Sequence, residues 1–521
     1  MATITVDGTP LEVPDGSMLL PVLLEHGVQI PHYCFHPKLS IDGSCRMCLV
    51  KVEGMPKLTI SCNTPVRDGM VVDTRGPEVT NARKGVIELL LLNHPLDCPI
   101  CDQAGECYLQ DYAYEYGTRE ARTREPRRKL LKRVDVGPRV VLDQERCILC
   151  RRCVRFCSEI TKTRELAVFN MGDESVLDTF PGEPLANDYS ICTADICPVG
   201  ALLSKDFHHK MRVWFLDETE SVCPGCANGC NVKVGVARRE VQRLLPRRND
   251  AVNDTWMCDA GRLGYRFVNE GRLRAPRIAR EGTQVAVGWD EALDEAATRL
   301  GALARGESAV AAIVSPHLTN EELFVLRQLV EHGLRARRHD VAIRIGAADD
   351  LLIKAEKAAN GRGARDLGLG TGTLDAIAAD IEAGTVRGLF VTGVDLWEVW
   401  GAGRAAALLG RLGTLVVQTS NAHPLADLAH VVLPGLTFAE KRGTFTNEAG
   451  RVQRIERALD PEEQPSDGEI FLRLGRRLGM ELPPGAFDPR AVLGEIARAV
   501  PAYAELTWDD LGSQGRATGA A

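Results

Sequence analysis

The segment 147-CILCRRCVRFC-157 is the most informative part of this 521-residue chain. Its cysteines follow the spacing C-x2-C-x2-C-x3-C, in which the first three thiolates hold one 4Fe-4S cluster and the fourth is directed towards a second cluster. Cys197, which is followed by Pro198, is suited to close the first cluster. The positions where a second triplet would lie are instead Asn187, Ser190 and Thr193. We therefore predict a single 4Fe-4S cluster in this region, bound by Cys147, Cys150, Cys153 and Cys197.

The chain has 17 cysteines, all between Cys34 and Cys258, which divides it into a cysteine-rich half and a cysteine-free half. The N-terminus has no basic segment followed by an apolar run, so no signal peptide is predicted and we expect the chain to stay in the cytoplasm. Thiols are kept reduced in that compartment, so the cysteines are expected to bind metal rather than to form disulfides. The net charge of −8 gives no support for nucleic-acid binding.

A first group of cysteines lies in an N-terminal region where two strands, a helix and a third strand are predicted. Residues 4–13 alternate and turn at Asp7-Gly8, residues 18–27 look helical, and residues 48–54 alternate again. This order is typical of a plant-type ferredoxin, a β-grasp domain that carries a 2Fe-2S cluster on a long loop. A zinc site is the alternative. The predicted 2Fe-2S ligands are Cys34, Cys45, Cys48 and Cys62.

A second group, in 93-NHPLDCPICDQAGEC-107, has only three cysteines at ligand spacing, while a predicted helix that stops at Pro95 brings His94 close to them. The alternative is that His94 binds no metal, because the helix dipole favours a histidine in the last turn of a helix whether or not it has a further role. Counting the cysteines supports the role of His94 as a ligand. Four groups need sixteen ligands, and only fifteen cysteines remain once Cys157 and Cys192 are set aside as spare buried thiols, so His94 would be the sixteenth. The predicted ligands of a 4Fe-4S cluster here are His94, Cys98, Cys101 and Cys107.

A fourth group is 223-CPGCANGC-230, closed by a distant cysteine. Its C-x2-C-x3-C…C order suits another 4Fe-4S cluster, with zinc again as the alternative. The predicted ligands are Cys223, Cys226, Cys230 and Cys258.

The cysteine-free half reads as an α/β domain. Three apolar strands are predicted at 309–315, 388–393 and 414–420, alternating with helical segments, which indicates a parallel sheet covered by helices on both faces. The glycine-rich segment 361–373 lacks a phosphate-binding motif and is predicted to be a flexible loop. The end of the chain after Pro501 is predicted to be frayed.

The order of these motifs resembles the iron-sulfur subunits of the G type in bacterial NADH-quinone oxidoreductase, and their mitochondrial 75 kDa counterpart in respiratory complex I, over residues 1 to about 270. Residues 271 to about 480 resemble the molybdopterin oxidoreductases more faintly. The resemblance implies the following domains: 1–78, a β-grasp 2Fe-2S ferredoxin domain; 79–118, the histidine-ligated 4Fe-4S segment; 119–215, a ferredoxin-like 4Fe-4S domain; 216–272, a further 4Fe-4S domain; 273–500, a degenerate molybdopterin-oxidoreductase-like α/β domain; 501–521, a tail.

The resemblance also implies a function, with one 2Fe-2S cluster, three 4Fe-4S clusters and no molybdenum cofactor. Electrons would arrive from the flavin-bearing subunit that oxidises NADH, pass through the binuclear, histidine-ligated and ferredoxin-like clusters, and leave towards the quinone-proximal iron-sulfur subunits. No residue of this chain would act as an acid, base or nucleophile. The protein would be peripheral, on the cytoplasmic side of the plasma membrane, and would reach the membrane only through its partner subunits.

Three alternatives differ from this function. An iron-only hydrogenase would need further cysteines after Cys258, and the sequence has none. The large subunit of an NAD-linked formate dehydrogenase would need a molybdenum ligand and a longer catalytic region. A zinc-stabilised scaffold protein that carries no electrons is the alternative from another class. The basic run 122–133 fits a solvated linker or a surface that contacts an acidic subunit.

Overall fold

The computed structural model describes residues 1–118, 120–305, 309–482 and 485–519. The chain forms two compact units, Met1–Phe215 and Leu216–Ala521. Within the described residues, no helix is both long enough and apolar enough to cross a membrane.

The N-terminal unit begins with a five-stranded sheet of strand order β2-β1-β5-β3-β4. A two-residue turn with positive φ at Asp7 and Gly8 joins the first two strands, as the sequence predicts. The first strand pairs in parallel with β5, and α1 ends before Gly27, whose φ of 77° suits glycine. These elements are β1 (Ala2–Val6), β2 (Thr9–Val13), α1 (Leu19–Glu25), β3 (Leu49–Val52), β4 (Thr59–Ile60) and β5 (Val71–Asp73). The predicted order of strands and helix is confirmed.

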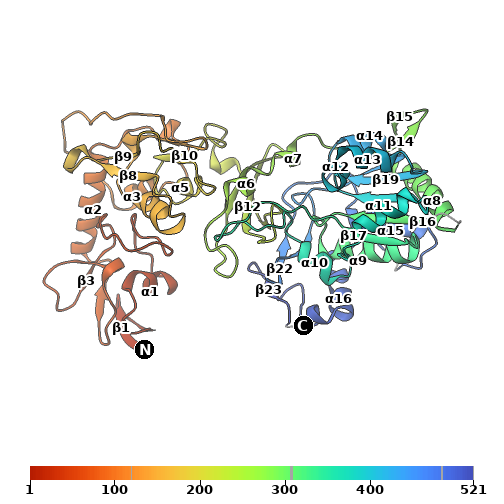
Figure 1. Cartoon of the computed structure of the whole chain (residues 1–521). Coiled ribbons are helices and arrows are strands. Elements are labelled where there is room, and N and C mark those ends of the chain that lie inside the picture. The colour runs from red at the N-terminus through yellow and green to blue at the C-terminus, as the bar shows by residue number, and fades with distance from the viewer. Residues whose placement is uncertain (119, 306–308, 483–484, 520–521) are drawn as a thin grey trace. The chain divides into compact units, whose positions relative to one another are not determined.

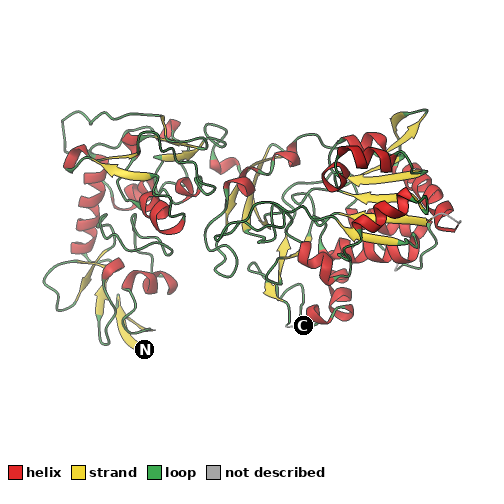
Figure 2. Cartoon of the chain, viewed as in Figure 1, coloured by secondary structure: helices red, strands yellow, loops and turns green. Residues whose placement is uncertain are grey.

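The rest of the N-terminal unit consists of short elements joined by long loops (Figure 2). Two longer helices, α2 (Pro77–Leu91) and α3 (Tyr108–Tyr116), lead into two small antiparallel sheets. The remaining elements are β6 (Val134–Asp135), β7 (Val140–Leu142), α4 (Arg152–Arg155), β8 (Leu166–Phe169), β9 (Val176–Thr179), α5 (Cys192–Asp195) and β10 (Leu202–Ser204). With so little regular structure, the cysteine loops depend on side-chain contacts to hold their shape.

The C-terminal unit starts with an antiparallel sheet and two short helices. These are β11 (Asp217–Val222), β12 (Asn231–Ala237), β13 (Glu240–Pro246), α6 (Asp259–Leu263) and α7 (Arg266–Asn269). A seven-stranded sheet follows, in the order β15-β14-β20-β19-β18-β16-β17. Its strands are β14 (Arg277–Arg280), β15 (Thr283–Ala286), β16 (Ala309–Val314), β17 (Arg338–Val341), β18 (Val386–Thr392), β19 (Thr414–Thr419) and β20 (Val431–Pro434).

Helices cover both faces of this sheet, as predicted (Figure 1). Alternate residues of β16 belong to two separate hydrophobic clusters: Val310 and Ala312 pack with α8, α9, α15 and α16, and Ala311 and Ile313 with α11, α12 and α13. The helices are α8 (Trp289–Arg305), α9 (Asn320–Gln328), α11 (Leu374–Glu382), α12 (Leu396–Trp400), α13 (Ala402–Leu409), α14 (Pro424–Leu428), α15 (Asp467–Arg477) and α16 (Pro489–Ala499). Such two-sided burial explains why the strands read as continuous apolar runs.

Two expectations for this half are wrong. The glycine-rich segment begins with a helix, α10 (Gly361–Asp366), which packs so closely that a side chain at Gly363 would place its Cβ 2.1 Å from the Asn320 Oδ1 atom. The end of the chain is packed rather than frayed as far as residue 519, since Tyr503 and Leu511 are buried in the cluster that α8 and α9 share; residues 520–521 lie outside the described residues. The strands β21 (Gly443–Thr446), β22 (Arg451–Ile455) and β23 (Arg516–Ala517) form a sheet that includes this end.

Candidate metal centres

The first group of cysteines lies on the loop between α1 and β3 and in the short helical turn Ser61–Asn63. Cys34, Cys48 and Cys62 are each 1% exposed. Interaction with the Cys45 side chain lowers the pKa of Cys34, and interaction with the Cys62 side chain lowers the pKa of Cys48. The Cys62 sulfur interacts electrostatically with the sulfurs of the other three cysteines. The loop thus brings the four predicted 2Fe-2S ligands into one buried cage.

Two buried arginines of α4 connect this loop to the third group of cysteines. The Arg155 guanidinium donates through Nη2 to the Cys34 carbonyl at 2.5 Å and to the Cys150 carbonyl at 3.3 Å. Arg152 donates to the carbonyl of Phe35 and, at 3.2 Å, to that of Ile196. Each guanidinium therefore links a backbone carbonyl near the first group of cysteines to a backbone carbonyl near the third group. The pattern of cysteines gave no signal for the contacts with Cys34 and Phe35, which join residues more than 100 positions apart.

The second group follows α2, which ends at Leu91. His94 is thus three residues beyond the helix and not in its last turn, so the helix dipole does not account for it. Burial, with Arg146 as the next cause, lowers the pKa of His94 to about 4, and its imidazole is neutral as a metal ligand must be. Arg146 also interacts with Cys101. The same guanidinium therefore acts electrostatically on both His94 and Cys101.

The three cysteines of the second group differ in exposure. Cys98 is exposed, whereas Cys101 and Cys107 are each 8% exposed. Cys107 precedes α3 as its N-terminal flanking residue. Arg212 donates at 2.6 Å to the Cys101 carbonyl, so this cage too is held by an arginine that the sequence pattern did not indicate.

The third group surrounds a small cavity whose lining includes Cys147, Cys150, Cys153 and Cys197. Leu149 and Arg151 adopt positive φ values of 51° and 58°, a conformation that side chains disfavour, and this wraps the backbone around the cavity. Cys157 is fully buried and is not part of the cavity lining. The four predicted ligands thus converge and the predicted spare thiol of the motif does not join them.

The second and third groups are also adjacent. A Cβ atom at Gly200 would lie 2.3 Å from the Cys101 sulfur, so only glycine fits at this position. Cys197 of the third group interacts electrostatically with Cys107 of the second. The third group therefore contacts both of the other groups of the N-terminal unit.

The fourth group lies in the C-terminal unit, between β11 and β12 and at the start of α6. Its sulfurs accept hydrogen bonds from nitrogen: Cys230 from Asn228 Nδ2 at 3.1 Å, and Cys258 from the Gly261 N–H at 3.3 Å. A Cβ at Gly261 would lie 3.1 Å from the Cys223 sulfur. Nitrogen donors directed at the sulfurs suit cysteines that bind an iron-sulfur cluster, because such hydrogen bonds help to set its reduction potential.

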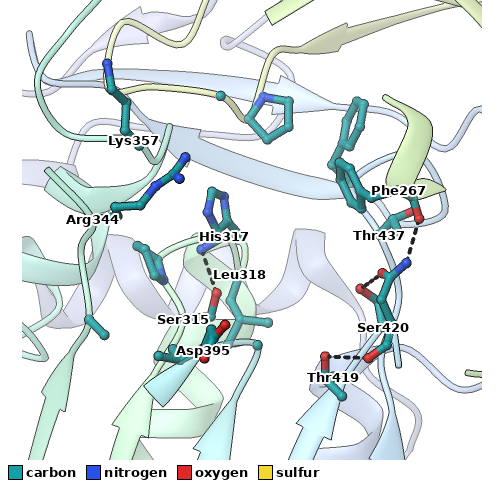
Figure 3. A pocket seen from close by; sticks show the side chains of 18 of the residues that line it. Phe267, Ser315, His317, Leu318, Arg344, Lys357, Asp395, Thr419, Ser420 and Thr437 are labelled. Carbon is teal, nitrogen blue, oxygen red and sulfur yellow. Dashed lines mark hydrogen bonds between the residues drawn. The ribbon is translucent and has the colours of Figure 1, made fainter. Parts of the chain in front are cut away.

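A cavity of about 720 Å³ adjoins this fourth group (Figure 3). It lies at the carboxyl ends of β16, β18 and β19, and its lining includes Cys223. His317, Arg344 and Lys357 lie on one side of it. Burial lowers the pKa of His317 to about 4. In an open α/β sheet, a cavity at this edge is the usual ligand site.

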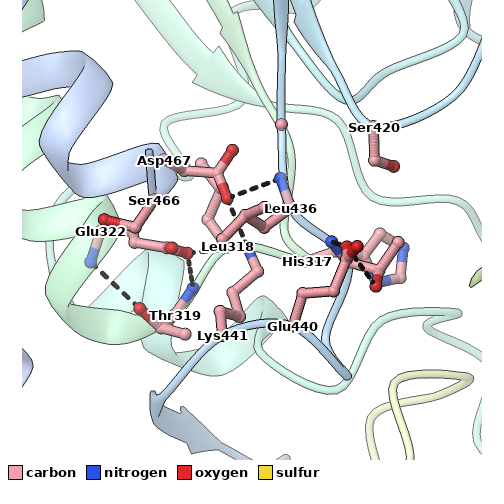
Figure 4. A network of polar contacts seen from close by, with 12 residues as sticks. His317, Leu318, Thr319, Glu322, Ser420, Leu436, Glu440, Lys441, Ser466 and Asp467 are labelled. Carbon is pink, nitrogen blue, oxygen red and sulfur yellow. Dashed lines mark hydrogen bonds and ion pairs between the residues drawn. The ribbon is translucent and has the colours of Figure 1, made fainter. Parts of the chain in front are cut away.

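A buried charge network stands beside the cavity (Figure 4). The Lys441 Nζ atom lies 2.9 Å from Glu322 Oε2 and 2.8 Å from Asp467 Oδ2, and the three side chains are at most 4% exposed. Burial raises the pKa of Glu322 to about 7. Two carboxylates and one ammonium are thus buried together at the edge of the cavity, whose lining includes Lys441 and Asp467.

Five family descriptions match the chain. They are the 2Fe-2S iron-sulfur cluster binding domain (1–77), the NADH-ubiquinone oxidoreductase-G iron-sulfur binding region (83–122), the ferredoxin-like domain of NADH-quinone oxidoreductase subunit 3 (137–203), the molybdopterin oxidoreductase Fe4S4 domain (216–270) and molybdopterin oxidoreductase (354–476). Fold and cysteine groups together define a protein with several iron-sulfur-binding domains.

Relatives with known names narrow this class. The second G-type subunit of the NADH-quinone oxidoreductase of Rhizobium meliloti (strain 1021) is 38% identical over 355 residues, 68% of this chain and 41% of the relative. The 75 kDa subunit of NADH-ubiquinone oxidoreductase from Reclinomonas americana is 38% identical over 330 residues, 63% of this chain and 48% of the relative. A chain of a solved NAD+-reducing [NiFe]-hydrogenase is 30% identical and covers 41% of this chain and 91% of its own, with a TM-score of 0.37, too low to establish a shared fold.

By these matches the chain belongs to the family formed by the G-type subunits of NADH-quinone oxidoreductase and the 75 kDa subunits. It spans less than half the length of the curated relatives that it matches.

Proposed function

We propose that this chain is an electron-transfer subunit of an NADH:quinone oxidoreductase, with one 2Fe-2S and three 4Fe-4S clusters on the sixteen predicted ligands. When bound, the clusters supply one-electron oxidation and reduction. The polypeptide holds the sulfurs, shields them from water and fixes their spacing. Electrons would enter from a flavin-bearing subunit that oxidises NADH and leave towards quinone-proximal iron-sulfur subunits, with the complex providing a peripheral attachment to the cytoplasmic face of the membrane.

The observation that carries this proposal is the bridging of three cysteine cages within one unit. Arg155 contacts carbonyls of Cys34 and Cys150, and Gly200 brings the chain next to the sulfur of Cys101. A scaffold that binds zinc would have no reason to place separate cages so close together, whereas electron transfer requires it. The contacts favour the order binuclear, ferredoxin-like and then histidine-ligated, which differs from the order that the resemblance suggested.

The proposal is tested by metal and sulfide analysis of protein purified without oxygen. We expect brown protein with about fourteen irons per chain, from one binuclear and three tetranuclear clusters. The matched pair Cys153→Ala and Cys157→Ala sharpens the test, because both thiols are in one motif and both are buried. The first variant should lose a tetranuclear signal in electron paramagnetic resonance spectra, and the second should keep every signal.

A colourless protein that contains a few zinc ions would contradict the proposal and support the scaffold alternative. Molybdenum bound in a stoichiometric amount would support the formate dehydrogenase alternative instead. Equal loss of signal in the Cys153→Ala and Cys157→Ala variants would contradict the ligand assignment of the third group.

A further inference from the structure

A carboxylate and two imidazoles meet in the N-terminal unit, apart from the predicted cluster ligands. Asp102 lies on the loop before α3, and His208 and His209 lie in a turn after β10. One possible ligand atom from each residue lies within 4.8 Å of the others. None of the three is needed as a cluster ligand.

The spacing of these atoms is that of ligands around an ion rather than of hydrogen-bonded partners. His208 Nε2 lies 3.8 Å from Asp102 Oδ2, and His209 Nδ1 lies 3.5 Å from Asp102 Oδ1. A good hydrogen bond between nitrogen and oxygen is about 2.7–3.2 Å long. Two ligands that are each about 2.0–2.2 Å from a tetrahedral zinc ion are separated by about 3.4 Å. The observed distances of 3.5 and 3.8 Å are therefore close to the edges of such a tetrahedron, and the side chains need to move together only slightly to bind an ion.

The Asp102 carboxylate is also short of partners. Its side chain is 7% exposed, yet within the described part of the chain its only hydrogen bond comes from the His209 backbone N–H, at 2.7 Å. A buried carboxylate is costly unless a positive charge or several donors compensate it. No described residue donates to, or accepts from, the ring nitrogens of His208 or His209. The cluster thus offers a negative charge and two unengaged imidazoles at one point.

The backbone directs the two consecutive histidines to the same side. His209 has a φ of 57°, an uncommon value for a residue with a side chain. This conformation brings its ring to 3.9 Å from that of His208, measured between ring centres. Neighbouring residues in extended backbone would point to opposite sides. Strain of this kind persists where the surrounding structure requires it, and here it aims both rings at one carboxylate.

From these observations we infer that Asp102, His208 and His209 bind a divalent cation of the zinc class. Two imidazoles and one carboxylate are a common zinc ligand set, which leaves a fourth position for water. The His209 side chain is 56% exposed and gives the ion a path from solvent. The site is separate from the sixteen predicted cluster ligands and does not depend on the proposed electron transfer.

The test uses the full chain, purified without oxygen and with its clusters in place. The protein is treated briefly with a chelator, equilibrated with a small excess of zinc chloride and desalted, and zinc and iron are then measured together by mass spectrometry. We expect the wild type to hold one zinc per chain more than the His209→Ala variant, at equal iron content. Removal of one of three ligands should weaken zinc binding at least about tenfold.

Two further variants make the result specific. His208→Gln, which keeps a polar side chain, should also lose the zinc, whereas His332→Ala, at an exposed histidine in the other unit, should keep it. The inference is overturned if the wild type takes up no zinc after chelation. It is equally overturned if the His209→Ala and His208→Gln variants both hold as much zinc per chain as the wild type.

Discussion

At the level of single residues, His94 is predicted to be a cluster ligand because the cysteines at ligand spacing are one short of the sixteen ligands needed. The alternative, that the helix dipole alone favours a histidine in the last helical turn, does not apply, since α2 ends at Leu91 and His94 lies beyond it. Its neutral imidazole lies beside Arg146, which also interacts with Cys101. As a ligand in place of thiolate, His94 would remove one negative charge from the cluster, and we expect this to raise the reduction potential relative to an all-cysteine cage.

Two substitutions test the role of His94. His94→Cys should preserve a tetranuclear cluster and lower its potential, which a redox titration followed by electron paramagnetic resonance would measure. His94→Ala should diminish the signal of this cluster and leave those of the other clusters intact. An unaltered spectrum in the alanine variant would show that His94 is not a ligand.

The arginines are the residues that a reading of the sequence missed. Cysteine spacing is local, so it reveals which thiols can share a cluster. It contains no information on which distant loop an arginine of the same motif will contact. Arg152 and Arg155 could have been noted as cations between ligands, but their acceptors, the carbonyls of Phe35 and Cys34, are over 110 residues away.

At the level of elements, Lys441 ties α9 and α15 to the loop that follows β20. Its ammonium lies between Glu322, near the start of α9, and Asp467, the first residue of α15. Removing one partner of a buried ion pair leaves an uncompensated charge, and this is strongly destabilising. The same elements supply much of the hydrophobic cluster on one face of the large sheet.

We therefore expect Lys441→Met to lower the free energy of unfolding of the C-terminal unit by about 3–5 kcal/mol. The double variant Lys441→Met with Glu322→Gln should recover part of the loss, because it buries one carboxylate fewer. Chemical denaturation followed by circular dichroism measures both effects. The control is Arg299→Met, which breaks a half-exposed pair with Glu295 on α8 and should change stability by less than about 1 kcal/mol. Similar losses for Lys441→Met and Arg299→Met would contradict the role of the network.

Elements with a clear period were predictable, and those without one were not. Strand β16 alternates between two buried faces and is evident as an apolar run. The end of the chain has isolated aromatic residues, among them Tyr503 and Trp508, in a polar context. They bury themselves in a cluster formed by distant helices, and such packing leaves no periodic trace in the sequence.

The ion-pair partners of the basic run 122–133 could not be predicted from the sequence and are seen only in the structure. Arg122 pairs with Glu88 of α2, and Lys132 lies within 4 Å of carboxylates of Asp97, Asp143 and Glu145. These cations balance acidic groups of their own unit. The segment is therefore in part an internal counter-charge for the surroundings of His94, which neither interpretation of the sequence included.

At the level of the whole molecule, the division after Phe215 separates the cysteine groups. The first three groups lie in Met1–Phe215, and the fourth lies in Leu216–Ala521 with the large sheet. The two hydrophobic clusters of the large sheet lie within the C-terminal unit, and a third cluster, which packs α1 against the five-stranded sheet, lies within the N-terminal unit. Each unit thus has its own core and its own candidate metal centres.

This division predicts that residues 1–215 and 216–521, expressed separately, each fold and take up iron. The N-terminal fragment should contain about ten irons and the C-terminal fragment about four. Iron analysis and thermal unfolding of the two fragments measure this. A C-terminal fragment that is folded but retains no iron would show that the fourth group does not bind a cluster by itself.

The guanidinium of Arg155 has a consequence for how the protein matures. It donates hydrogen bonds to backbone carbonyls of two cages, so the loop with Cys34 and the motif with Cys150 are expected to become ordered together. If both cages bind clusters, filling one would fix the carbonyl that orders the other, and we expect cluster insertion to be cooperative. Conversely, oxidative loss of one cluster would loosen its neighbour. Damage and repair of these two centres should then occur together.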